Sequence, residues 1–316
     1  MFETPVLFIV FNRPDTAQQV FNVIKRIKPK YLYIAADGPR SDIPSDVEKC
    51  KRTRLIVDQV DWDCEIKTLF RDQNKGCGRG PAEAITWFFE YEDEGIILED
   101  DCLPNEEFFE FIPLMLEKYR NDSRIFLIIG TNFLGEWRPK KHSYFFSLFA
   151  HTWGWATWKR AWNLYDFELN NWGLTENFQL LRQRLQNKKM YSHLCKLYNN
   201  TKENIQTVSW WDFQWLCCMQ ISNGLCIVPS INLVKNIGIG IDAVHTIRNS
   251  PSTPILNYAS GLFPIIENIK IQPDKKFDSI YFLKAFQQKR KLYKRIIHYC
   301  MKRIKRFYNI GELCTL

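Results

Sequence analysis

The segment Gly95-Ile-Ile-Leu-Glu-Asp-Asp101 sets three acidic residues directly after a short apolar run. An apolar run of this length is typical of a strand that is buried on both faces of a parallel sheet. Three adjacent carboxylates repel one another unless a cation or hydrogen bonds neutralise them. Because ligands bind beyond the carboxyl ends of the strands in open α/β sheets, the triplet predicts a binding site. A solvated acidic turn is the alternative interpretation of the triplet alone.

The rest of the first half alternates apolar runs with segments of helical pattern. We expect strands over Val6–Phe11, Tyr31–Ala36, Cys64–Phe70, Gly95–Leu98 and Ile125–Ile129. We expect helices over Pro14–Ile27, Val47–Val60, Pro81–Tyr91 and Phe108–Tyr119. This alternation predicts an α/β fold with a Rossmann-like, mostly parallel open sheet flanked by helices.

Polar residues also follow three other predicted strands. Asn12-Arg13-Pro14 follows the first strand, Asp37-Gly38 the second, and Arg71-Asp-Gln-Asn-Lys-Gly76 the third. The carboxyl ends of parallel strands meet at one edge of a sheet, so we expect these groups near the acidic triplet. Loop solubility explains one or two such segments, whereas four at one edge favour a ligand site.

The residue types at this edge suit a cation and a phosphate. Mg²⁺ and Mn²⁺ prefer oxygen ligands, commonly one or two carboxylates together with substrate phosphates. Arg13 can bind a phosphate bidentately, and Arg79, just before the helix expected from Pro81, is a second phosphate candidate. Asp37 and Asp72 can accept hydrogen bonds from a ribose hydroxyl or a base N–H, although each also suits an ordinary turn.

The second half is less regular. Two tryptophan-dense segments, Trp153–Trp162 and Ser209–Trp215, are expected to be helical or turn-like, and Gly224–Pro229 predicts a strand. Asp212 lies within the second tryptophan-dense segment, where apolar neighbours would desolvate its carboxylate and raise its basicity. It is therefore a candidate general base, with a helix-capping aspartate as the alternative. His151 is a candidate for the wall of an acceptor or donor-sugar site.

Several motifs occur in an order that resembles nucleotide-diphospho-sugar transferases of the GT-A fold. These are F-N-R-P, A-D-G-P, R-D-Q-N-K-G and L-E-D-D in the first half. Within that fold the chain is most similar to the N-acetylglucosaminyltransferase I group, whose metal motif is also E-D-D. Bacterial HlpA-like hemolytic or capsule-locus transferases share this layout. The likeness continues through Trp210–Trp215, Gly224–Pro229 and Asn236–Gly238, and it spans residues 5–245. It departs at Asp212, a single aspartate where the group has paired acids.

The resemblance implies a role for each matching residue. Asp101 would bind the metal directly, with Asp100 facing the donor ribose or sugar and Glu99 facing the sugar. Asp212 would be the general base, and the late His245 would contribute to the metal or diphosphate. Asp37 and Asp72 would contact the uridine-like nucleoside, and Arg13 would contact a phosphate.

The predicted function is a metal-dependent inverting glycosyltransferase that uses Mn²⁺ or Mg²⁺. It would move a sugar from a nucleotide-diphosphate sugar, with UDP-sugar favoured, to a saccharide hydroxyl in the synthesis of bacterial surface glycans. One alternative is a sugar-1-phosphate nucleotidyltransferase. That class uses a glycine-rich first loop with a basic residue, whereas Phe11-Asn-Arg-Pro14 has no glycine. A surface adhesin or hemolysin is a non-enzymatic alternative.

The formal charge of +8 is concentrated near the C-terminus. Residues 279–311 hold ten Lys or Arg and no acid, which leaves about −2 for the rest and disfavours a nucleic-acid partner. We expect one GT-A domain over 1–245, divided into a nucleotide-binding half (1–130) and an acceptor half (131–245). A wrapping linker (246–275) and a basic amphipathic helical tail (276–316) would follow. Residues 284–306 suit an anionic membrane surface, where a lipid-linked glycan acceptor would lie, or else pack on the body.

The cysteine pattern and the N-terminus bear on location. The ten cysteines include no C-x-x-C pair, which indicates reduced thiols. The N-terminus has no basic region, and the apolar run Val6–Phe11 is too short for a signal peptide. No apolar run reaches the ~18 residues of a membrane span. These features predict a cytoplasmic enzyme, and membrane binding by the basic tail would place it at the inner face of the cell membrane.

Overall fold

The computed structural model describes residues 1–185, 187–238, 256–267 and 270–287. Within these ranges the centre of the molecule is an eight-stranded sheet in the order β3-β2-β1-β4-β8-β6-β9-β7. Its strands are β1 (Val6–Val10), β2 (Tyr31–Ala36), β3 (Glu65–Phe70), β4 (Glu94–Glu99), β6 (Ile125–Ile129), β7 (Tyr144–Ser147), β8 (Trp155–Trp158) and β9 (Leu225–Pro229).

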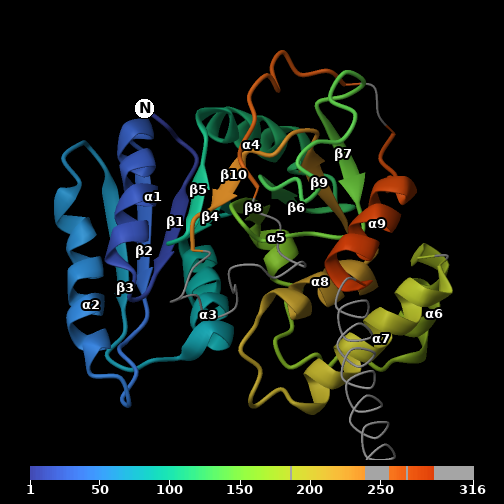
Figure 1. Cartoon of the computed structure of the whole chain (residues 1–316), viewed down its shortest axis with the longest axis horizontal. Helices are drawn as coiled ribbons and strands as arrows, with labels where there is room; N and C mark the ends of the chain where they lie inside the picture. The colour runs from blue at the N-terminus through green and yellow to red at the C-terminus, as the bar shows by residue number, and fades with distance from the viewer. Residues whose placement is uncertain (186, 239–255, 268–269, 288–316) are drawn as a thin grey trace, which may run out of the picture.

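The sheet is mostly parallel. Strands β3, β2, β1 and β4 pair in parallel, as do β6 and β9, whereas β8 runs antiparallel to β4 and β6, and β7 antiparallel to β9. Six of the eight described strands therefore point the same way. The predicted fold class, a mostly parallel α/β sheet flanked by helices, is confirmed (Figure 1).

Helices and short helical turns connect the strands. They are α1 (Pro14–Ile27), α2 (Ser45–Arg54), η1 (Leu55–Gln59), α3 (Gly76–Tyr91), α4 (Glu106–Tyr119), α5 (Lys159–Trp162), α6 (Thr175–Leu185), α7 (Lys188–Glu203), α8 (Asp212–Ile221), α9 (Lys275–Phe282) and η2 (Leu283–Gln287). Helix α1 shows why such segments fold as they do. It begins with Pro14, and its buried residues Ala17, Phe21 and Ile24 recur at helical spacing on one face.

The register of β1 and β4 determines where the acidic triplet lies. The apolar segments of both strands, Val6–Val10 and Ile96–Leu98, are almost entirely buried, as their sequences predict. Ile9 of β1 lies opposite Glu99 of β4. The residues after Glu99 are therefore next to the loop that follows β1.

A second, two-stranded sheet runs beside the triplet. Strand β5 (Cys102–Pro104) pairs antiparallel with β10 (Val234–Asn236), and Cys102 lies opposite Asn236. The backbone N–H of Ile237 donates to the Asp101 carbonyl oxygen at 2.8 Å. Residues more than 130 positions later in the chain thus lie against the turn formed by the acidic triplet, called the acidic turn below.

Several elements differ from the sequence-based expectation. Trp155–Trp158, expected to be helical or turn-like, forms the buried strand β8 between β4 and β6. All four of its residues are buried, so the alternation that marks a strand is missing from its sequence. Helix α3 begins at Gly76, five residues before the expected Pro81. Strand β7 and helices α6 and α7 were not predicted.

The C-terminal part of the described chain packs on the body. Asp274 caps α9, because its side chain accepts hydrogen bonds from the backbone N–H groups of residues 276 and 277. Phe277, Tyr281 and Phe282 of α9 are buried. Most of the predicted basic tail lies outside the described residues.

Two further observations concern the described residues only. Their eight cysteines are free thiols. None of their helices combines the length and the apolar character that crossing a membrane requires.

Candidate active site

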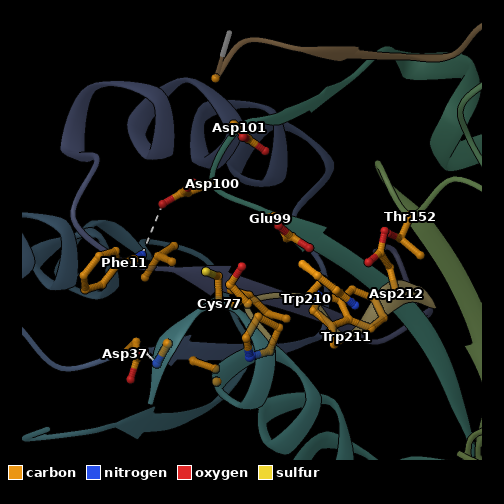
Figure 2. Close-up of a pocket in the computed structure, with 18 of the residues that line it drawn as sticks. Phe11, Asp37, Cys77, Glu99, Asp100, Asp101, Thr152, Trp210, Trp211 and Asp212 are labelled. Atoms are coloured by element: carbon orange, nitrogen blue, oxygen red, sulfur yellow. Dashed lines mark hydrogen bonds between the residues drawn. The ribbon is translucent and has the colours of Figure 1, made fainter. Parts of the chain in front are cut away.

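A cavity of about 450 Å³ opens at the carboxyl ends of β1, β2 and β4. Its volume lies in the range of small-molecule sites. Residues from the strand ends form one side, and residues 151–153 and 209–213 form the other (Figure 2). The sequence-derived candidates that line it are Arg13, Asp37, Glu99, Asp100, Asp101, His151 and Asp212.

The acidic turn is held by the loop after β1. The backbone N–H of Phe11 donates to Asp100 Oδ2 at 3.1 Å. Arg13 Nη1 lies 2.9 Å from Asp101 Oδ2 and 3.4 Å from Asp100 Oδ1, so one guanidinium nitrogen pairs with both aspartates. These contacts hold Phe11 and Arg13 against Asp100 and Asp101, nearly ninety positions later in the chain, at one edge of the sheet.

The carboxylates of this turn are short of positive charge. Burial raises the pKa of Glu99 well above its ordinary value, and the charges of Asp101, Asp100 and Asp212 raise it further. Burial raises the pKa of Asp100 to about 7, although the Arg13 charge acts in the opposite direction. Such shifts arise where carboxylates are buried close together without a sufficient counter-ion. The turn therefore suits a bound cation.

The protein side of a metal site fits this turn only in part. Among the described residues no group of three or more His, Cys, Asp or Glu side chains is arranged to hold a metal ion. Mg²⁺ and Mn²⁺ commonly take one or two carboxylates and complete their shell with water and substrate phosphates. Gly238 leaves the Asp101 carboxylate room, since a methyl group there would lie 2.2 Å from Asp101 Oδ2. The turn thus fits a cation that takes part of its ligands from these carboxylates and the rest from a substrate phosphate and water.

Asp37 ties the end of β2 to the start of α3. Its carboxylate accepts hydrogen bonds from the backbone N–H groups of Gly38, Lys75 and Gly76 at 2.9–3.0 Å, and from Asn74 Nδ2 at 3.1 Å. Burial raises its pKa, while these backbone N–H groups act to lower it. Asp37 therefore shapes the pocket floor through contacts within the protein.

Two arginines in the cavity wall were not singled out from the sequence. Arg40 lies 5.5 Å from the centre of the Phe11 ring, and its Nε is 2.6 Å from Asp46 Oδ2. Asp46 is buried and also accepts a hydrogen bond from Asn12 Nδ2 at 2.7 Å. Arg71 lines the same side of the cavity. Arg71 opens the motif after β3, which was a usable signal, whereas Arg40 stands in an ordinary turn sequence.

The opposite wall is aromatic. It contains Trp153, Trp210, Trp211 and Phe213, with Asp212 as the first residue of α8. The Trp211 ring stacks on buried Trp155 with centroids 5.6 Å apart. Figure 2 shows Glu99 between the Asp100–Asp101 pair and Asp212. After burial and the charges of Asp101 and Asp100, the Asp212 charge also raises the pKa of Glu99.

His151 is an uncharged member of this wall. Its ring stacks on Phe133 with centroids 5.1 Å apart, and the Trp153 ring lies 4.5 Å away. Burial lowers the pKa of His151 to about 4. The imidazole is therefore neutral at physiological pH and extends the aromatic surface.

Two candidates among the described residues, Asp72 and Arg79, are not brought to the cavity. Asp72 is exposed and is not part of the cavity lining among the described residues. Arg79 pairs with Glu168 at 2.6 Å and covers the Phe167 ring at 4.5 Å. Because α3 begins at Gly76, Arg79 lies inside the helix and not before its first turn as expected. His245 lies outside the described residues.

Comparison with known proteins leaves the activity open. No family model matches the chain, and no curated protein matches it. Among solved structures it is similar to a UDP-glucose pyrophosphorylase complexed with UDP-glucose, at 8% identity and a TM-score of 0.35, over 73% of this chain and 92% of the other.

Two further solved structures are similar at the same level. An inositol-1-phosphate CTP transferase from T. maritima has 8% identity and a TM-score of 0.35, over 72% of this chain and 86% of the other. HddC from Yersinia pseudotuberculosis has 9% identity and a TM-score of 0.31, over 50% of this chain and 77% of the other. The UDP-glucose pyrophosphorylase and the CTP transferase carry the names of nucleotidyl-transferring enzymes, the class given as an alternative in the sequence analysis. Similarity this low is a likeness of the α/β architecture alone.

Proposed function

We propose that the protein is a metal-dependent glycosyltransferase. Its donor would be a nucleoside-diphosphate sugar, with UDP-sugar favoured, and its acceptor a saccharide hydroxyl. The observation that carries the proposal is that one cavity is lined by both the acidic turn after β4 and Asp212 of α8. The first suits a cation with a diphosphate, and the second suits a base beside the sugar. The metal-dependent, inverting transfer that we propose uses both.

The strand-end side of the cavity would hold the donor. Asp101 would bind Mn²⁺ or Mg²⁺, with Glu99 and Asp100 turned toward the donor, and Arg13 would contact a phosphate. When bound, the cation neutralises the charge that develops on the departing diphosphate. Because Arg13 pairs with Asp100 and Asp101 in the structure, it would have to exchange part of this pairing for the phosphate.

The aromatic side would hold the acceptor and the base. The acceptor oxygen forms a bond to the anomeric carbon while its proton moves to the Asp212 carboxylate. The bond from that carbon to the diphosphate oxygen breaks, and its electron pair leaves with the diphosphate. Attack from the opposite face inverts the anomeric centre. Trp210 and Trp211 would limit the access of water, which competes with the acceptor.

A saccharide of a bacterial surface glycan, presented on a lipid at the inner face of the membrane, remains our proposed acceptor. The basic segment 284–306 would then contact anionic lipid. Residues from 288 onward lie outside the described part of the chain. Vesicle binding by the full chain, compared with a chain that ends at residue 287, tests this part separately.

A sugar-1-phosphate nucleotidyltransferase is the second candidate. Arg13 favours it, because this class uses a basic residue in the loop after the first strand and Arg13 lines the cavity. That loop lacks the glycines of the class. In addition, a sugar phosphate is already an anionic nucleophile, so nucleotidyl transfer assigns no proton-accepting role to Asp212.

One pair of assays separates the two candidates. The full-length protein is incubated with a panel of nucleoside-diphosphate sugars and saccharide acceptors, with and without Mn²⁺, and release of nucleoside diphosphate is measured. In parallel it is given nucleoside triphosphates with sugar 1-phosphates, and release of pyrophosphate is measured. We expect metal-dependent release of nucleoside diphosphate. Undiminished turnover in metal-free buffer would contradict the mechanism, and pyrophosphate release alone would establish the second candidate.

A further inference from the structure

The start of α3 approaches both sides of the cavity through glycines. A methyl group added to Gly80 would lie 3.2 Å from Asp37 Oδ2, on the strand-end side. A methyl group added to Gly78, two residues earlier, would lie 2.9 Å from the carbonyl oxygen of Val208, on the aromatic side. The first turn of α3 therefore fits between Asp37 and residues 208–210 because these positions lack side chains.

The segment that faces Gly78 is the main chain that leads to Asp212. The same added methyl group would lie 3.3 Å from the Trp210 carbonyl oxygen and 3.4 Å from the Trp210 nitrogen. Main-chain atoms cannot turn aside as the end of a flexible side chain can. Trp210 is two residues before Asp212, so a shift of this segment is passed directly to the start of α8.

Hydrogen bonds hold the same segment from inside the protein. Gln214 Nε2 donates to the Trp210 carbonyl oxygen at 3.1 Å, and Gln214 is fully buried. Tyr165 Oη donates to the Trp211 carbonyl oxygen at 3.2 Å. The Trp210 carbonyl group, which Gly78 of α3 approaches, is thus also held by Gln214, and the next carbonyl group along the chain is held by Tyr165. The segment has little freedom to absorb a displacement.

We propose that Gly78 is a positioning residue that, together with Tyr165, clamps residues 208–211 and so sets the place of Asp212 relative to the donor. This inference rests on the proposed function in one respect, the role of Asp212 as the base. A side chain at position 78 would move the base and leave the donor side intact. A misplacement of about 1 Å in a reacting group can cost about a hundredfold in rate.

Two alanine variants in the same turn test the proposal with a matched chemical change. We expect Gly78→Ala to lower kcat about 10- to 100-fold while the donor KM changes less than about threefold. We expect Gly80→Ala to raise the donor KM instead, because its methyl group meets Asp37. Loss of the same parameter in both variants, or a Gly78→Ala kcat within about twofold of wild type, would overturn the proposal.

A spectroscopic measurement tests the clamp without turnover. In protein labelled with 5-fluorotryptophan, the ¹⁹F resonance of Trp210 is assigned from its loss in Trp210→Phe. We expect this resonance to move in Gly78→Ala and to stay in place in Gly80→Ala. An unmoved Trp210 resonance in folded Gly78→Ala overturns the clamp. If the wild-type protein transfers no sugar, the proposed function fails while this spectrum still decides the clamp.

Tyr165→Phe covers the case in which Gly78→Ala does not fold. It removes the hydroxyl group that donates a hydrogen bond to the Trp211 carbonyl oxygen, so this carbonyl group is no longer held. We expect a lower kcat with the affinity for nucleoside diphosphate and Mn²⁺ unchanged in calorimetric titration. A wild-type kcat in folded Tyr165→Phe would overturn the proposal.

Discussion

The two sides of the cavity are built in different ways. On the strand-end side, carboxylates and guanidinium groups project from the ends of neighbouring parallel strands, as Asp100 and Arg13 do. On the aromatic side, rings from residues 151–153 and 209–213 are supported by packing between distant segments, such as Trp211 on Trp155. The first side follows from sheet topology, and the second follows from tertiary packing. We infer that the two sides also differ in function: charged groups on the strand-end side bind the donor, and packing on the aromatic side positions the base.

The largest expected effect tests the strand-end side. Asp101→Asn should lower activity by at least about 10³-fold and abolish metal-dependent nucleotide binding, because it removes the carboxylate proposed to hold the cation. Activity and calorimetric titration with Mn²⁺ and nucleoside diphosphate measure both. Asp93→Asn, at the exposed residue just before β4, is the matched control and should behave as wild type. Unchanged metal dependence in Asp101→Asn would place the cation elsewhere.

The aromatic side gives the next effect. Asp212→Asn should lower kcat by about 10²- to 10⁴-fold, since an amide accepts no proton from the acceptor. Nucleotide binding with Mn²⁺ should stay within about threefold, because the donor side is untouched. Steady-state kinetics and the same titration provide the two numbers. Equal losses of kcat and nucleotide affinity would remove the division between the two sides.

A buried carboxyl behind the aromatic side provides a pH test of stability. Asp278 of α9 accepts hydrogen bonds from Ser147 Oγ at 2.6 Å and the Leu148 N–H at 3.2 Å, and burial raises its pKa to about 7. The folded state then binds more protons than the unfolded state between about pH 4 and pH 7, so stability falls as the pH rises through this window.

Asp278→Asn should remove this pH dependence. Relative to the variant, wild type should lose on the order of 3–4 kcal/mol of unfolding free energy between pH 4 and pH 8. Urea denaturation at several pH values gives the difference, and any constant offset from the lost hydrogen bond cancels. Parallel curves for the two proteins would show that Asp278 is ionised throughout.

The smallest expected effect is that the His151 imidazole does not titrate in the physiological pH range. Because burial lowers its pKa to about 4, its imidazole should show no protonation between pH 5.5 and 8 in a ¹⁵N NMR titration. A His151 midpoint near the ordinary value of about 6.5 would mean that water reaches this wall freely.

The contrast between the two sides also explains what the sequence could predict. Apolar runs followed by polar groups identified the ends of β1, β2 and β4, and topology alone then gathers Arg13, Asp37 and Glu99. Local patterns were sufficient because each side chain follows directly from its own strand. Arg79 was misplaced for a local reason, since the glycines at 76, 78 and 80 did not suggest that the helix begins before Pro81.

The other side required knowledge of packing between distant segments. Strand β8 lies between β4 and β6 and is buried throughout, so its sequence resembles a buried helix as much as a strand. That Gly238 would return to Asp101 depends on the pairing of β5 with β10 across more than a hundred residues. No local pattern encodes such a contact. The approach of Asp212 toward Glu99 depends on packing in the same way.

The position of β8 has a consequence for the order of folding. The first 99 residues supply β3, β2, β1 and β4 as one continuous parallel ribbon, but β4 gains its second neighbour only when residues 155–158 arrive. Until then, during synthesis on the ribosome, β4 presents an unpaired edge whose central residues Ile96–Leu98 are apolar, the kind of edge that promotes aggregation. A nascent chain that stalls near residue 130 would therefore depend on chaperones, and so would the fragment 1–130 expressed on its own.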